Sequence, residues 1–411
     1  MRIKMQPFEL PAQTANMRKR RVFLTQMLFA GAALATRSRA ATLPEPSSVV
    51  SNPPRRWDAH ASAHYVPDPD ILSLDADFKA MLFPGANIER VVTGMGWLEG
   101  PAWLGEARML LLSDTVRSQQ YRFVPSDTTG DGSLSVYRQE SYHSNGNTLD
   151  TTGRVVTCEH DMRRVVRWEL DGSCHVVADR FEGKTLNSPN DVVVHPGDGS
   201  IWFSDPAYGD TLIEGHPDSP GGLANRDGRL RWNLGDEVPT QFAGHARQPD
   251  HVFRVDAQSG AVEAVLTQEQ LPSPNGLCFS PDLKTLYVIS CNPDPGQQGA
   301  KGDNTIHAFD MVDGRPRHGR LFSDMMLDGH HMVPDGMRAD VFGNLWCGAS
   351  GPLGLAGVFC FNSAGKLIGR IRLPSGCSNP TFGGIKRNEL YMCAGHDLFR
   401  LRLETQGAGL S

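Results

Sequence analysis

The sequence predicts an all-β protein, a six-bladed β-propeller whose last blade is completed by a strand from the N-terminal side. Two observations carry this prediction. A short motif of a polar residue, a turn residue and apolar residues recurs six times, and β-rich runs of four to seven residues follow most copies. The copies span residues 99–103, 145–149, 190–194, 275–279, 335–339 and 379–383. Their starts lie 46, 45, 85, 60 and 44 residues apart, and a period near 45 is typical of propeller blades.

Composition limits the partners of the chain. With 411 residues, 39% of them hydrophobic, the chain is long enough for one large domain or two medium ones. The 40 basic and 46 acidic residues give a formal charge of −6, so no global basic face is expected, and we predict no nucleic-acid partner. The eight cysteines form no C-x-x-C motif, which disfavours a zinc site or a redox pair and favours small core residues.

Residues 1–40 resemble a twin-arginine-type signal peptide. An arginine pair at residues 20–21 precedes an apolar run of 14 residues, and a membrane-spanning helix needs ~20. We predict cleavage after Ala40, a leader or linker over residues 41–77, a periplasmic or secreted location, and no membrane association after signal removal. The alternative, an amphipathic helix of the domain, is disfavoured because further arginines interrupt the run and prolines follow it.

The predicted propeller spans residues 78–405, preceded by a short helix within 75–82. Second strands are expected at 109–113, 155–158, 201–204, 286–290, 345–348 and 390–393, and third strands at 165–170, 305–309, 358–361 and 398–403. Because the last copy is followed by only two further β-rich runs, residues 87–93 are expected to complete its blade. A polar, glycine-rich insertion at about 206–250 accounts for the spacing of 85 residues.

The first motif position reads Glu99, Asn145, Asn190, Asn275, Asp335 and Asn379 in the six copies. Innermost strands line the channel of a propeller, so these side chains should converge near its axis. Any single Asn-Gly or Asp-Gly pair has the alternative explanation of an ordinary turn. Two carboxylates aimed at one channel would repel each other unless a cation lay between them.

The donor set predicts the kind of cation. Carboxylate and carboxamide oxygens without His or Cys favour Ca²⁺, followed by Mg²⁺ or Mn²⁺, with Zn²⁺ disfavoured. Open coordination positions would allow the ion to polarise a carbonyl and activate water, so hydrolysis of an ester or similar acyl group is expected, with Asp335 or Glu99 as general base. Serine-hydrolase, zinc-protease and phosphate-binding motifs are absent from the sequence.

Two further motifs in the sequence are weaker. Residues 127–132 look superficially like a calcium loop, but their oxygens are misplaced, so a hairpin turn is predicted. His160 follows a predicted strand at the position of a channel-mouth residue, where a lone histidine is either a packed residue or a functional one.

Nine ordered motifs between about residues 78 and 403 resemble the SMP-30/gluconolactonase/luciferin-regenerating family, with the match nearest to its bacterial gluconolactonases. They are Glu99-Gly100-Pro101, Ser144-Asn145-Gly146-Asn147-Thr148, Cys158-Glu159-His160, Glu182-Gly183-Lys184, Asn187-Ser188-Pro189-Asn190-Asp191, Ser204-Asp205-Pro206, Pro274-Asn275-Gly276, Pro334-Asp335-Gly336 and Gly343-Asn344-Leu345-Trp346. The resemblance implies a six-bladed propeller with metal ligands at Glu99, Asn190, Asn275 and Asp335. It also implies lactone hydrolysis with Asp335 as base.

The resemblance further implies a small-molecule sugar lactone as substrate, such as glucono-1,5-lactone, contacted by Asn145, His160 and Asn190. Two alternatives stay open: hydrolysis of another ester, aromatic lactone or phosphotriester, and a non-catalytic propeller that calcium stabilises. The insertion is either a surface loop or a lid whose arginines at positions 226, 229 and 231 meet sugar hydroxyls.

Overall fold

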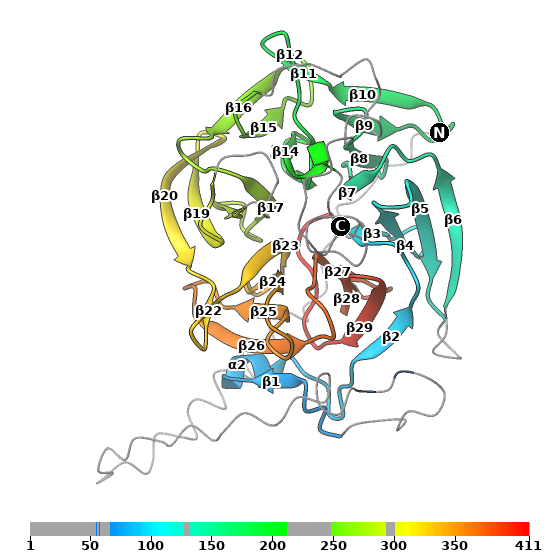
Figure 1. Ribbon diagram of the computed structural model, residues 1–411, viewed down its shortest axis with the longest axis vertical. Helices are drawn as coiled ribbons and strands as arrows, with labels where there is room; N and C mark the ends of the chain where they lie inside the picture. Colours follow the sequence, from blue (N-terminus) through cyan, green and yellow to red (C-terminus); the bar gives the residue numbers. More distant parts are fainter. Residues whose placement is uncertain are drawn as a thin grey trace, which may run out of the picture. The chain divides into compact units, whose positions relative to one another are not determined.

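A computed structural model describes Arg55, Trp57 and residues 66–126, 132–211, 248–292 and 301–410. Six antiparallel sheets stand around a common axis, with one strand of each at the centre (Figure 1). The predicted all-β, six-bladed propeller is therefore confirmed. Four predictions lie wholly or largely outside the described residues: the signal peptide, most of the leader, the turn at 127–132 and the middle of the insertion, residues 212–247 with its three arginines.

The first three blades follow the chain from the inner strand to the outer one. Blade 1 contains β3 (Leu98–Leu104), β4 (Met109–Asp114), β5 (Gln119–Val124) and β6 (Ser133–Gln139). Blade 2 contains β7 (Ser144–Leu149), β8 (Val155–Glu159), β9 (Arg164–Trp168) and β10 (Cys174–Ala178). Blade 3 contains β13 (Val192–Val194), β14 (Ile201–Asp205), β15 (His251–Val255) and β16 (Val262–Thr267). The insertion thus connects the second and third strands of blade 3.

The remaining blades have the same order. Blade 4 contains β17 (Pro274–Phe279), β18 (Thr285–Ser290), β19 (Thr305–Val312) and β20 (Arg315–Ser323). Blade 5 contains β23 (Val333–Ala339), β24 (Leu345–Ser350), β25 (Gly357–Phe361) and β26 (Leu367–Arg372), and blade 6 contains β27 (Asn379–Gly383), β28 (Glu389–Ala394) and β29 (Asp397–Arg402). Short pieces outside the blades are β11 (Arg180–Phe181), β12 (Lys184–Thr185), β21 (Met326–Leu327), β22 (His330–His331) and the 3₁₀ turn η1 (Tyr208–Thr211).

Blade 6 is completed from the N-terminal side, as predicted. Strand β2 (Glu89–Val92) pairs antiparallel with β29, and both Nε and Nη2 of Arg400 donate to the Glu89 carboxylate, at 2.8 and 2.6 Å. This pairing removes an exposed sheet edge and joins segments about 300 residues apart in the sequence.

A second N-terminal strand extends blade 5. Strand β1 (Ile71–Ser73) pairs with β26, and Arg372 Nε donates to the buried Asp70 carboxylate at 2.9 Å. The short helix α2 (Ala76–Ala80) follows, capped by Asp75, and buries Phe78 against Trp346. Blade 5 therefore includes residues that precede the predicted domain boundary at residue 78. The buried Asp70–Arg372 ion pair holds the segment that leads into β1.

Aromatic side chains pack neighbouring blades together. Trp202 meets Phe279 between blades 3 and 4, Trp346 meets Phe382 between blades 5 and 6, and Trp103 stacks on Tyr391 between blades 6 and 1. Seven of the eight cysteines are buried and all eight are free thiols, in agreement with the prediction that most are small core residues.

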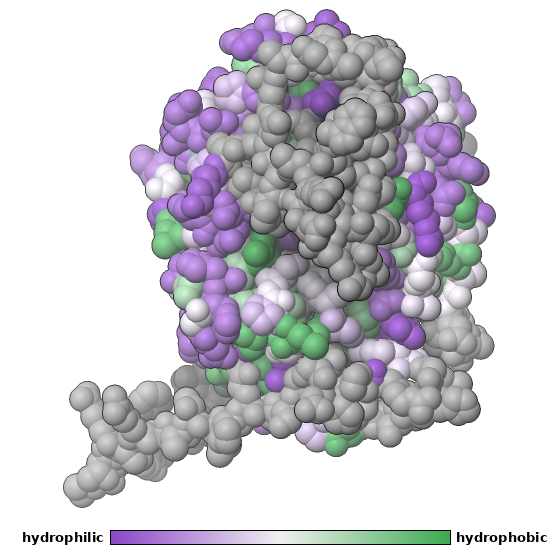
Figure 2. All heavy atoms as spheres, viewed as in Figure 1, coloured by the Kyte–Doolittle hydropathy of each residue, from purple (hydrophilic) through white to green (hydrophobic). Residues whose placement is uncertain are grey.

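The outer edges are polar. Strand β20 is mostly exposed and carries three arginines, and hydrophilic side chains gather along the side of the molecule formed by β16 and β20 (Figure 2). Charged side chains on an edge strand oppose pairing with another chain. Among the described residues, no helix has the length and apolar character needed to cross a bilayer.

Candidate active site

Four of the six motif copies are β-bulges within inner strands. The pairing of inner and second strands shifts register at Glu99-Gly100 in β3, Asn145-Gly146 in β7, Asn275-Gly276 in β17 and Asp335-Gly336 in β23. A bulge bends the strand and redirects its side chains, and bulges are common next to active sites. These pairs are therefore not the hairpin turns that their composition alone would favour.

The bulge glycines allow the inner strands of blades 1, 2 and 3 to touch. A Cβ atom at Gly100 would lie 2.0 Å from the Asn145 carbonyl oxygen, and one at Gly146 would lie 2.5 Å from the Asn190 carbonyl oxygen. The Gly146 N–H instead donates to that Asn190 oxygen at 2.8 Å. Glu99, Asn145 and Asn190 thus start three adjacent segments around the channel.

Blades 4, 5 and 6 meet in the same way. A Cβ atom at Gly276 would lie 2.3 Å from the Asp335 carbonyl oxygen, and one at Gly336 would lie 2.4 Å from Asn379 Oδ1. Asn275, Asp335 and Asn379 therefore form the other half of the ring of motif residues.

Two contacts join the halves. The Ser378 hydroxyl donates to the Leu98 carbonyl oxygen at 2.7 Å, between blades 6 and 1. Between blades 3 and 4, β13 packs against β17, and the Tyr208 hydroxyl donates to the Ser273 carbonyl oxygen at 2.7 Å. All six motif starts consequently lie at one end of the channel, and Glu99, Asn190, Asn275 and Asp335 are among them.

The two carboxylates act on one thiol. Cys377 is fully buried, and burial, followed by the neighbouring Cys393 thiol and then by groups that include Asp335 and Glu99, raises the pKa of its thiol well above the usual value. Glu99 and Asp335 therefore both lie close enough to the Cys377 thiol to influence its pKa. Glu99 is only 2% exposed and accepts a hydrogen bond from the Gly100 N–H at 3.1 Å. A cation at this end of the channel would offset the repulsion between the two groups.

A cysteine behind Asn275 orients its carboxamide. Asn275 Nδ2 donates to Cys291 Sγ at 3.5 Å, and the Cys291 thiol lies 2.8 Å from the Pro334 carbonyl oxygen, next to Asp335. Because its nitrogen is engaged there, the carboxamide oxygen of Asn275 is the atom left for another partner. Cys291 thus connects the segments of Asn275 and Asp335, although it lies in neither motif.

Asn379 adds an unpaired oxygen to the ring. It is 2% exposed, and its Oδ1 has no hydrogen-bond partner among the residues that the structure describes. A buried acceptor without a donor is costly unless water or an ion satisfies it. Two carboxylates and the Asn190 and Asn275 carboxamides belong to the same channel end, and such oxygens are the donor types that a divalent cation takes.

His160 is covered rather than exposed. It is 4% exposed, and a Cβ atom at Gly209, in η1 at the start of the insertion, would lie 2.3 Å from its ring. Burial, then the charges of His143 and Arg163, lower its pKa to about 3. His160 is therefore a neutral imidazole at neutral pH, and its buried Nε2 has no partner within the described ranges.

Both described ends of the insertion are held beside the ring. The Ser188 hydroxyl donates to the Pro206 carbonyl oxygen at 2.7 Å and accepts from the Gly209 N–H at 3.0 Å. At the other end, Asn187 exchanges two hydrogen bonds with the Gln248 backbone, at 3.0 and 3.1 Å. The insertion thus leaves from and returns to the channel end that carries the motif residues.

Two residues of this region were not assigned from the sequence. Asn379 carried a usable signal, because it occupies the same motif position as Asp335 and Asn275. Cys291 carried none, since it lies 16 residues after Asn275 and meets it only through the pairing of β17 with β18.

Comparison with known proteins matches this architecture. Residues 97–396 match the model of the SMP-30/gluconolactonase/LRE-like region. The chain is 27% identical to a gluconolactonase of Zymomonas mobilis over 80% of this chain and 84% of that protein, and 29% identical to a lactonohydrolase of Aspergillus oryzae over 39% of this chain and 35% of that protein. A solved gluconolactonase from Xanthomonas campestris superposes with a TM-score of 0.63 and 31% identity, covering 81% of this chain and 94% of that one.

Proposed function

Since the chain belongs to the SMP-30/gluconolactonase/LRE-like family, we propose that it is a lactonase that depends on a divalent cation. Lactone hydrolysis as the reaction class is supported by the gluconolactonase and lactonohydrolase relatives. Glu99, Asn190, Asn275 and Asp335 are proposed to hold the cation, with Ca²⁺ first, Mg²⁺ or Mn²⁺ next and Zn²⁺ last.

One observation carries the proposal: inner strands from separate blades bring both carboxylates and the carboxamides to one end of the channel. When bound, a divalent cation supplies positive charge that polarises a lactone carbonyl. Asp335 accepts a proton from the attacking water as the water oxygen bonds to the carbonyl carbon. The ring C–O bond then breaks, and the leaving oxygen takes the proton back to give a hydroxy acid.

The remaining residues of this end position the substrate. Asn145 and Asn190 offer carboxamides at the ring, and Asn190 is fixed through its backbone by bonds from its N–H to Ser204 and from Gly146 to its oxygen. Neutral His160 can accept or donate a hydrogen bond without adding charge. A sugar lactone, with several hydroxyls, is the substrate class that such polar groups suit.

We also propose export. The arginine pair and short apolar run in residues 1–40 support a twin-arginine-type signal and a periplasmic or secreted enzyme. In that location it would meet sugar lactones formed outside the cytoplasm.

The test is a pH-stat assay of the purified protein on a panel of lactones, esters and a phosphotriester, before and after chelation and after return of Ca²⁺. We expect glucono-1,5-lactone or a related sugar lactone to be opened fastest, and the activity to disappear with chelator and return with metal. Cation binding without turnover of any panel member would contradict the proposed lactonase and favour a calcium-stabilised binding module.

A further inference from the structure

A cavity of about 110 Å³ lies at the other end of the channel. It is lined where the inner strands finish, by Thr148, Val194, Phe279 and Ala339 among others. Ala339 is four residues beyond Asp335 on β23, a separation of about 13 Å along a strand. The cavity thus lies at the opposite end of the inner strands from the six motif starts, although Arg338, which lines it, reaches back to Asp191 beside Asn190.

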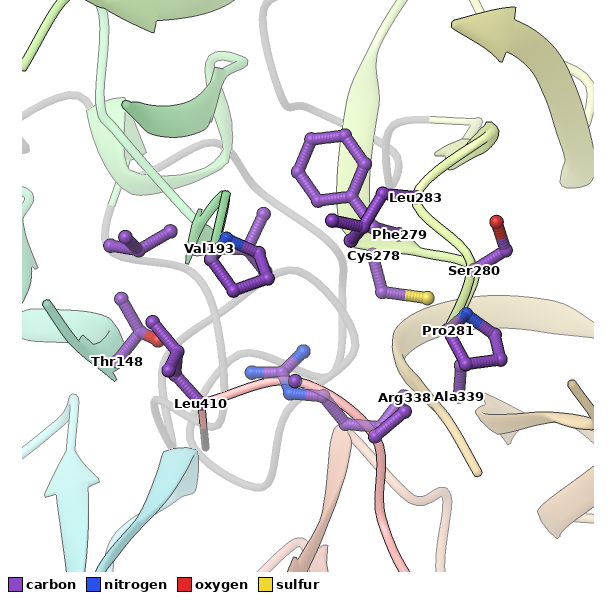
Figure 3. Close-up of a pocket in the computed structure, with 14 residues that line it drawn as sticks. Thr148, Val193, Cys278, Phe279, Ser280, Pro281, Leu283, Arg338, Ala339 and Leu410 are labelled. Atoms are coloured by element: carbon purple, nitrogen blue, oxygen red, sulfur yellow. The ribbon is translucent and has the colours of Figure 1, made fainter. Parts of the chain in front are cut away.

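The C-terminal segment closes this end. The Ala408 N–H donates to the Ala339 carbonyl oxygen at 2.9 Å, and the Gln406 carbonyl oxygen accepts from the Val341 N–H at 2.9 Å. Leu410, further along the same segment, lines the cavity near Thr148 (Figure 3).

Arg338 extends into this space. Its side chain reaches from β23 into the gap between Val193, Cys278 and Leu410 (Figure 3), and the residue is only 3% exposed. Nη1 donates to Asp191 Oδ2 at 3.3 Å and to the Met337 carbonyl oxygen at 2.8 Å. Nε and Nη2 have no partner among the described residues. The edge of the buried guanidinium formed by Nε and Nη2 is therefore available to a ligand.

The unused edge has the geometry of a carboxylate receptor. The N–H bonds of Nε and Nη2 point the same way from one side of the planar guanidinium, and two such donors match the two oxygens of a carboxylate. Unsatisfied donors on a buried charge are costly, so an acceptor is expected there. These donors exclude a cation. Because Asp191 already pairs with the guanidinium, a bound anion adds net negative charge to this space, which disfavours a dianion more strongly than a monoanion.

The volume and the apolar lining of the cavity limit the size and polarity of the rest of the ligand. An apolar cavity of about 150 Å³ is large enough for benzene, so this one admits only a few heavy atoms. Val193, Val194 and Phe279 give it an apolar wall opposite the guanidinium. We propose that this cavity is a second ligand site, which binds a short monocarboxylate such as acetate or propionate in bidentate fashion on Arg338. Water is the competing occupant.

The test is isothermal titration and thermal unfolding of the full chain with sodium propionate and sodium acetate, against sodium chloride at equal ionic strength. The chelator-treated protein is used, so that a carboxylate cannot act through a cation at the other end of the channel. We expect saturable binding and a rise in melting temperature with both carboxylates, and none with chloride. No saturable binding, or an equal shift with chloride, would overturn the proposal.

Three variants locate the site. Arg338→Lys keeps the positive charge but loses the two parallel N–H donors, and should weaken propionate binding about tenfold or more. Asp191→Asn/Arg338→Met removes the guanidinium without leaving a buried carboxylate unpaired, and should abolish binding. Ala339→Leu leaves the ion pair intact but fills part of the cavity, and should exclude propionate. Unchanged affinity in a folded double variant, or propionate density away from Arg338 in a soaked crystal, would also overturn the proposal.

Discussion

The two ends of the channel differ in the charge that they present. At the end where the inner strands begin, Glu99 and Asp335 bring negative charge, and Asn275 and Asn379 present oxygens. At the end where the same strands finish, the walls are mostly apolar and the one guanidinium, on Arg338, has an edge without a partner among the described residues. The two proposed sites, for a cation at one end and for an anion at the other, would therefore be built by one set of strands.

The difference between the two ends follows from where the bulges lie along the inner strands. In four of the six inner strands a bulge lies near the start, where it redirects polar side chains, and the regular pairing that follows leaves apolar residues at the finish. Four variants test this division, from the largest expected effect to the smallest.

Replacing Asp335 by Asn should remove the proposed base without changing the shape of the side chain. We expect kcat/KM for the best lactone to fall about 10³-fold, within the range that general bases contribute. The pH-stat assay measures the fall, and thermal unfolding verifies the fold. Asp171→Asn, in an exposed turn of blade 2, is the matched control. A loss of less than tenfold would exclude Asp335 from proton transfer.

Replacing Arg338 by Met should destabilise the protein, because it leaves the Asp191 carboxylate buried without its partner. Breaking such a pair costs about 3–5 kcal/mol in the free energy of unfolding, which urea denaturation measures. The double variant Asp191→Asn/Arg338→Met should recover most of the loss. A single variant as stable as the parent would mean that this ion pair does not hold blades 3 and 5 together.

His160 should make the protein less stable in acid. Its pKa of about 3 lies below the usual 6.5, so below pH 6.5 the unfolded chain takes up a proton that the folded chain does not. Stability should therefore fall as the pH drops from 6.5 toward 3, by about 2 kcal/mol at pH 5. His160→Phe keeps a ring against Gly209 and should lose this part of the pH dependence. Identical pH profiles for the variant and parent would contradict the burial of a neutral imidazole.

Cys291 should influence the cation indirectly, through Asn275 and through the Pro334 carbonyl beside Asp335. Cys291→Ala frees the Asn275 nitrogen, and removing such an orienting partner weakens metal binding by about tenfold or slightly more. Calcium titration calorimetry measures the change. Cys360→Ala, a buried thiol of blade 5, is the control for the loss of a core sulfur. Equal calcium affinity in the two variants would remove Cys291 from the support of the site.

The sequence was sufficient to predict the fold because every blade repeats one pattern of strands. Residues 87–93 were expected to complete blade 6, and β2 does so. The addition of β1 to blade 5 was not foreseen, since three residues next to prolines give no strand signal. Their position depends on the Asp70–Arg372 ion pair, whose members lie 302 positions apart.

The site was predictable only in part. The six motif starts could be aligned, and the structure places them around one channel end, while their roles as ligands and base stay predictions. Contacts between blades have no such signal. Neither Arg338 and Asp191 nor Asn275 and Cys291 stand in a recognisable pattern, because each pair forms only after distant segments have packed.

The pairing of β2 with β29 also determines when the propeller can close during synthesis of the chain. Glu89 leaves the ribosome long before Arg400, so the ring stays open until the final blade has been made, and until then both strands lack their edge partners. An incomplete chain would expose those edges to aggregation. If the protein is exported in the folded state, as proposed above, truncated copies whose ring cannot close would be rejected by the export machinery.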